Sequence, residues 1–163
     1  MGWVTLSLRK MALKQRVSNL EYRLVQISQQ QQTLANQSSY AQRYNGMMQN
    51  QQMMQLNVDR LNYLKDARAN AANSGSTDYQ SQLDLQTALD EINLNYQFNQ
   101  MNLESVFQAQ EDSMLQEVNR QQQQLELEQE QIQTQLAAAQ AELESLDSAI
   151  SNDIKNGAIK LTS

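Results

Sequence analysis

The chain has 163 residues and a formal net charge of −6, and it contains no proline, no cysteine and no histidine. Without cysteine there is no disulfide framework, thiolate metal site or cysteine nucleophile, and without histidine there is no imidazole base. The chain has 29 glutamines and 15 asparagines but only four glycines, whereas a β-sandwich or an α/β enzyme normally needs more Gly and Pro to turn the chain. The composition therefore favours a helical protein of about one domain.

The first residues carry no classical targeting signal. The short apolar run Trp3–Leu8 is followed directly by Arg9 and Lys10, whereas a signal peptide has its charges first and a longer apolar core. Position 6 is Leu rather than the Ser or Thr of a myristoylation signal. No stretch approaches the roughly 18 apolar residues of a membrane span. We expect a cytoplasmic protein, or one that is exported or packaged without a cleaved signal peptide.

Apolar residues spaced alternately three and four apart predict a long helix over residues 8–72. The first part of this stripe is Leu13, Val17, Leu20, Leu24, Ile27 and Leu34. The stripe weakens at Gln31 and Ser38 and resumes at Met47, Met54, Val58, Leu61 and Leu64. This is the a/d pattern of a coiled-coil seam. At Asn45-Gly46 the helix either continues, kinks or breaks.

A second stripe predicts a helix over residues 78–155. Its members are Leu85, Leu89, Ile92, Tyr96, Leu103, Phe107, Met114, Val118, Leu125, Ile132, Leu136, Ala139, Leu143, Leu146 and Ile150. Residues 73–77 are the predicted loop, because Gly75 can adopt the left-handed conformation that ends a helix. Thr77 and Gln80 match a capping box that starts the next helix. Gly157 is expected to end that helix, leaving residues 156–163 as a tail.

The charge distribution predicts that the two helices pair as an antiparallel coiled-coil hairpin, an all-α single domain over residues 1–163. Residues 1–70 carry nine basic and three acidic side chains, whereas residues 78–163 carry three basic and fifteen acidic ones. A basic helix and an acidic helix attract each other. Folding the chain about residue 75 opposes the two apolar stripes. The ion pairs predicted by this register are Arg9–Glu142, Arg23–Glu126, Arg60–Asp90 and Lys65–Asp84.

Two further features follow from the predicted register. Val58 would face Ile92, and Met54 would face Tyr96. The glutamine tracts at 29–32 and 121–124 would face each other and form a polar belt that specifies register, as a buried amide does in a coiled coil.

Several apolar residues lie beside the seam or at the chain ends and are candidate interaction residues. In the middle of the hairpin these are Met47, Met48, Met53, Met54, Phe98 and Met101. Either they widen the seam, or they contact further copies of the chain. At the ends, Trp3, Val4, Leu6, Ile159 and Leu161 belong to short segments that alternate apolar and polar residues. These ends are either short strands that pair, or the first helical turn and a frayed tail.

No residue pattern indicates a catalytic, cofactor or metal site. The 18 carboxylates have no histidine beside them, no EF-hand loop is present, and no glycine-rich loop can cradle a phosphate. The net charge is acidic, which disfavours nucleic acid as a partner. We therefore expect a protein that is not an enzyme and binds no cofactor, no metal and no nucleic acid.

The predicted architecture resembles that of three unrelated groups. These are helical-hairpin subunits of secretion-apparatus needles and filaments, helical virion proteins of bacteriophages, and prefoldin-like holdase chaperones. The resemblance is one of architecture alone, so it assigns no site residue. It implies a structural protein that self-associates as a subunit of a filament, a secretion-apparatus appendage or a virion-type particle. The alternative is a coiled-coil adaptor or holdase that grips a partner protein.

Overall fold

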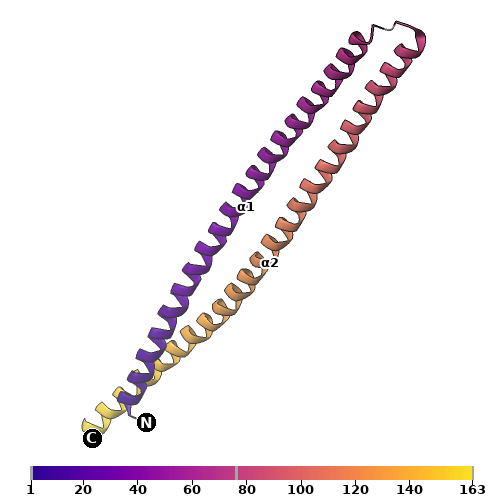
Figure 1. The fold of residues 1–163 in the computed structure, drawn as a ribbon. Helices are drawn as coiled ribbons and strands as arrows, with labels where there is room; N and C mark the ends of the chain where they lie inside the picture. Colours follow the sequence, from indigo (N-terminus) through magenta and orange to yellow (C-terminus); the bar gives the residue numbers. More distant parts are fainter. Residues whose placement is uncertain (1, 76, 163) are drawn as a thin grey trace. The chain divides into compact units, whose positions relative to one another are not determined.

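The computed structural model describes the backbone of residues 2–75 and 77–162, with side chains as far as Gly157. It contains helix α1, Trp3–Asn73, and helix α2, Tyr79–Thr162, which pack against each other in opposite directions (Figure 1). Within the described part of the chain there is no strand. The predicted all-α helical hairpin is confirmed.

Both helices extend beyond their predicted limits. α1 begins at Trp3 rather than residue 8, and α2 continues to Thr162 rather than ending near residue 155. Of the two alternatives for the ends, short strands are wrong, whereas the prediction that the first residues form the first helical turn is confirmed, since α1 begins at Trp3. Gly157 lies inside α2 instead of ending it. Adding a turn to an existing helix gains one hydrogen bond per residue fixed, whereas a two-stranded ribbon is only marginally stable. The predicted tail, residues 156–163, is helical as far as Thr162.

α1 ends at Asn73, and Gly75, two residues later, adopts the left-handed conformation. Ser74 N–H donates to the Asn70 carbonyl at 3.1 Å and Gly75 N–H donates to the Ala72 carbonyl at 3.3 Å. Gly75 has a φ of 66°, the conformation that glycine adopts without steric cost. The predicted helix end at Gly75 is confirmed.

The start of α2 is capped by Asp78 rather than by Thr77. Ser81 N–H donates to the Asp78 carboxylate at 2.9 Å, which satisfies one of the unpaired donors of the first turn. Gln80 instead donates to Asp84 at 3.0 Å, on the helix surface. The predicted capping box was therefore placed one residue too early.

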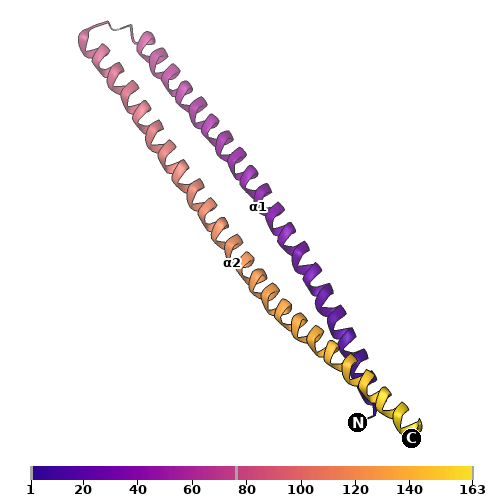
Figure 2. The same cartoon turned by 180° about the vertical axis from the view of Figure 1, so that it is seen from behind.

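Contacts divide the chain into two units. Unit 1 is Met1–Asn36 with Val118–Ser163, and unit 2 is Gln37–Glu117. In each unit a segment of α1 lies beside an antiparallel segment of α2, and the views from front and back agree on this (Figures 1 and 2). We describe each unit by itself. That the chain forms a single domain stays a prediction.

Unit 1 contains most of the buried apolar side chains. These are Leu13, Ile27, Ile132, Ala139 and Leu146. All of them belong to the predicted stripes, so the seam is confirmed in this unit. The buried residues Ile132, Ala139 and Leu146 are seven residues apart on α2, which is the repeat of a coiled coil.

Ion pairs cross the seam of unit 1. Arg9 pairs with Glu142, as predicted, and Lys10 pairs with Asp147. Arg23 donates through Nε to Glu128 at 2.6 Å, not to the predicted Glu126. Each such partly exposed pair contributes only about 0–1 kcal/mol, so the pairs set register more than stability.

The predicted belt of facing glutamine tracts is displaced. The side-chain amide of Gln31 donates to Gln129 at 3.3 Å, so Gln31 contacts a residue beyond the tract at 121–124. An amide contact across the helices therefore exists, but with a different partner from the one predicted, and its role in specifying register stays a prediction.

The predicted α2 stripe is confirmed along its full length, because each of its members is buried or half-buried. The second part of the α1 stripe is wrong: of its residues only Leu64 is half-buried, while Met47, Met54, Val58 and Leu61 are exposed. α1 passes through Asn45-Gly46 without a break, so it keeps its phase. Two heptads after Leu34 comes the half-buried Met48, and Met47 is rotated from it by about 100°.

Two glycines provide a matched test of the loop. Gly75→Ala should lower the free energy of unfolding by about 1 kcal/mol, because alanine is strained at positive φ. Gly46→Ala should raise it by about 0.5–1 kcal/mol, because Gly46 lies inside α1, where nothing lies within 4 Å of an added Cβ. Urea unfolding followed by circular dichroism measures both. Equal effects of the two substitutions would contradict the assigned ends of α1.

Candidate interaction surface

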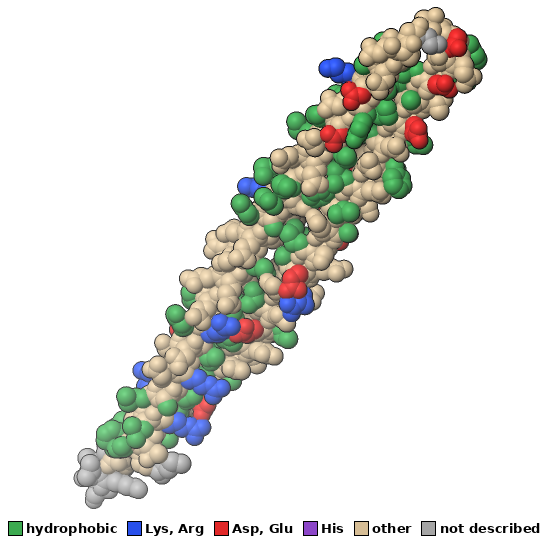
Figure 3. All heavy atoms as spheres, in the orientation of Figure 1, with side chains coloured by type: hydrophobic (Ala, Val, Ile, Leu, Met, Phe, Trp, Pro, Cys, Tyr) green, Lys and Arg blue, Asp and Glu red, His purple; other side chains and the backbone are tan. Residues whose placement is uncertain are grey.

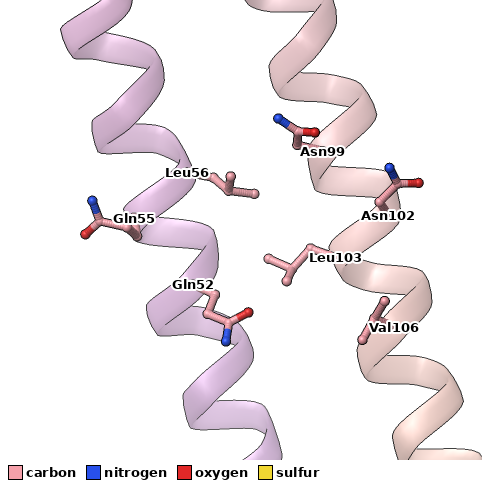
Figure 4. Close-up of a pocket in the computed structure, with 7 residues that line it drawn as sticks. All are labelled: Gln52, Gln55, Leu56, Asn99, Asn102, Leu103 and Val106. Atoms are coloured by element: carbon pink, nitrogen blue, oxygen red, sulfur yellow. The ribbon is translucent and has the colours of Figure 1, made fainter.

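The seam of unit 2 is loose. Leu56 and Leu103 point toward each other across the space between the helices, beside polar side chains such as Gln52 and Asn99 (Figure 4). The groove at this point has a volume of about 440 Å³. Among the described residues of unit 2, Phe107 is the one buried apolar side chain. Unit 2 therefore gains less from its own seam than unit 1 does.

A cation occupies the seam of unit 2 near the groove. The guanidinium of Arg60 lies 4.5 Å from the centre of the Tyr96 ring and donates to Asn57 at 2.8 Å. Its Nε is buried and has no hydrogen-bond partner. A stacked guanidinium over an aromatic ring contributes roughly 0.5–2 kcal/mol. The contact also aligns residue 60 with residue 96 along the hairpin.

The ion pairs predicted for unit 2 are not formed. Arg60 faces Tyr96 instead of Asp90, and Asp90 accepts a hydrogen bond from Gln86 at 2.9 Å on its own helix. Lys65 forms no ion pair with the residues described. The predicted register was off by several residues here because it relied on the misplaced part of the α1 stripe.

An apolar stripe runs along the outer face of α1 in unit 2. Val58 follows Leu56 by two residues and precedes Arg60 by two, and both of these neighbours line the space between the helices. Two residues correspond to a rotation of about 200°, so Val58 lies on the side of α1 away from α2. The exposed members of this stripe are Tyr40, Tyr44, Met47, Met54, Val58 and Leu61. We call it the α1 outer stripe.

A second apolar stripe lies on the outer face of α2. Leu94 and Phe98 flank Tyr96 at two residues on either side, and Met101 precedes Leu103 by two. Their exposed fractions are 66%, 64% and 68%, respectively. The same rotation argument places them on the side of α2 away from α1. These three residues form the α2 outer stripe.

Both stripes have the spacing of a helix-packing surface. Tyr40, Tyr44, Met47, Met54, Val58 and Leu61 are separated by steps of four, three, seven, four and three residues. Leu94, Phe98 and Met101 are separated by four and three. Figure 3 shows hydrophobic side chains at the surface of both helix segments of unit 2. An alternation of threes and fours is the pattern by which a helix packs along another helix.

The structure separates the predicted interaction residues into three groups. Met47, Met54, Phe98 and Met101 are exposed on the outer stripes, whereas Met48 and Met53 are half-buried toward the seam. Trp3 and Val4 are exposed in the first turn of α1, and Leu6 is half-buried there. Ile159 and Leu161 lie outside the residues whose side chains are described.

The sequence prediction missed part of this surface. Tyr44 and Leu94 were not singled out, and Val58 and Leu61 were assigned to the seam. The four-and-three spacing of Leu94, Phe98 and Met101 was visible in the sequence, as was that of Tyr40, Tyr44 and Met47. What the sequence did not show is the phase of each stripe relative to the partner helix.

The charges of the two helix segments of unit 2 are complementary. Residues 37–73 carry four basic and two acidic side chains, whereas residues 79–117 carry seven acidic and no basic ones. Arg43 and Lys65 are exposed on α1 and form no ion pair with described residues. The two outer faces of unit 2 thus have opposite electrostatic character.

The described residues give no indication of a metal site or a membrane-spanning helix. Over the described residues, no three acidic side chains are grouped so as to hold a metal ion. In the same part of the chain, no helix has a stretch long and apolar enough to cross a membrane. No protein-family model, no curated protein and no solved structure matches the chain.

A matched pair of leucines tests the assignment of seam and outer face. Leu103→Ala should lower the free energy of unfolding by about 1–2 kcal/mol, since Leu103 is half-buried against Leu56. Leu94→Ala should change it by less than about 0.5 kcal/mol, because Leu94 is mostly exposed. Urea unfolding should be measured in dilute protein. A cost for Leu94→Ala as large as that for Leu103→Ala would contradict the assignment.

Proposed function

We propose that this chain is a non-enzymatic structural protein that self-associates as a subunit of a larger assembly of the filament, appendage or virion type. The observation that carries the proposal is the presence of two exposed apolar stripes at helix-packing spacing on unit 2. Isolated exposed apolar residues are common on soluble proteins, but contiguous apolar surface typically marks an interaction site.

The loose seam of unit 2 supports the same proposal. A single hairpin that buries one apolar side chain in this unit gains little from its own packing, because most helical stability in proteins comes from burying an apolar face. Further helices against the outer stripes would supply the missing burial. A subunit whose packing is completed by its neighbours is typical of a structural assembly.

The oligomeric mass tests this proposal directly. Light scattering after size exclusion should give a mass that rises with protein concentration well above the 18.7 kDa of one chain. The mass should fall when a mild denaturant weakens apolar contacts. A mass of one chain at every concentration would contradict self-association and favour an adaptor that requires a different protein as its partner.

A further inference from the structure

We infer that the α1 outer stripe of one chain packs against the α2 outer stripe of a second copy, so that hairpins associate side by side. This inference rests on the proposed self-association and specifies its contact. The two stripes lie on opposite faces of unit 2, since each is turned away from the common seam. One copy can therefore contact a neighbour on each side.

Residues of the two stripes lie at the same positions along the axis of unit 2. The stacking of Arg60 on Tyr96 places these two residues side by side. Since the helices are antiparallel, Val58 is then level with Phe98, two residues further along α2. By the same count Leu61 is level with residue 95, beside Leu94. When two hairpins lie side by side without an axial shift, these apolar residues meet.

Met54 of the α1 outer stripe also has an apolar residue of the α2 outer stripe at nearly the same level. Met54 is level with residue 102, next to the exposed Met101. Met–Met and Met–Phe contacts adapt to imperfect packing because the methionine side chain is flexible and polarizable. The arrangement thus pairs apolar with apolar along about two turns of each helix.

The charges flanking the stripes match at the same register. Lys65 is level with Glu91, and Arg43 is level with residue 113, beside Asp112. All four side chains are exposed, and none of them forms an ion pair with a described residue of its own chain. In the side-by-side arrangement each cation meets a carboxylate of the neighbour, whereas a contact between two α2 segments would bring seven carboxylates against seven.

A single contact engages one stripe of each copy, and the exposed side chains of the two stripes present on the order of 1,000 Å² in total, compared with about 1,600 Å² in a standard interface. The contact between two copies is therefore small, and stable association depends on its repetition from copy to copy. Because different faces of the two copies meet, the contact is heterologous. A heterologous contact repeats from copy to copy and generates either a ring or an open array.

Cysteine cross-linking tests the contact, and the chain contains no cysteine of its own. Val58→Cys and Phe98→Cys are made as two separate variants, mixed at a concentration where light scattering shows assembly, and oxidised. The mixture should yield several-fold more disulfide-linked dimer than either variant alone. The control is Val58→Cys mixed with Asn99→Cys, because Asn99 lies at nearly the same level as Phe98 but lines the groove between the two helices of its own hairpin; this pair should cross-link weakly.

The outcomes separate the contact from the proposed function. If the mixture is assembled but the variants cross-link as readily alone as when mixed, like faces meet like and the heterologous contact is wrong. If an assembled mixture gives no more cross-linking than the Asn99→Cys control, the stripes are not the interface, although self-association stands. If every sample has the mass of one chain, the contact and the proposed function both fail.

Discussion

The structure of this protein depends on one constraint, which is that an unbroken helix keeps its phase. A residue's direction is fixed by its distance along the helix from the residues that contact the partner. α1 runs without interruption from Trp3 to Asn73. The face it presents to α2 therefore follows from its spacing and cannot be readjusted locally to bury whichever apolar residues are available. In unit 2 this constraint places Leu56 and Arg60 in the seam and Val58 outside it.

The outcome is a difference in packing between the two units. Unit 1 buries apolar residues of both stripes and adds ion pairs across the seam, such as Arg9–Glu142. Unit 2 places a guanidinium and several amides between its helices and leaves large apolar side chains exposed. Polar seam residues are costly for stability unless they are satisfied. Polar residues in the seam of unit 2 are consistent with a seam that sets register. The large apolar side chains of unit 2 lie instead on the two outer stripes, where they can be buried by a further contact.

Much of the fold follows from the sequence. The α2 stripe predicted from spacing alone is buried or half-buried at each of its positions, and Gly75 ends α1 as predicted. The errors have a common origin. The stripe at Met47, Met54, Val58 and Leu61 has as regular a spacing as the true seam, and spacing alone does not tell which of two parallel stripes on one helix faces the partner. Choosing the wrong stripe also displaced the predicted partners of Arg60 and Lys65. Of the Met-rich candidate residues, Met47, Met54, Phe98 and Met101 are exposed, and their role in interaction stays a prediction. The same error kept Val58 and Leu61 out of the candidate surface.

The native methionines allow the central claim to be measured without any substitution. Peroxide converts exposed methionine to the sulfoxide faster than buried methionine, and mass spectrometry reads each position. In dilute protein, Met54 and Met101, which are 70% and 68% exposed, should oxidise faster than the half-buried Met53 and Met114. In assembled protein, Met54 and Met101 should become protected. Slow oxidation of Met54 and Met101 in dilute single chains would contradict the account, because it would place these residues in the seam of the hairpin.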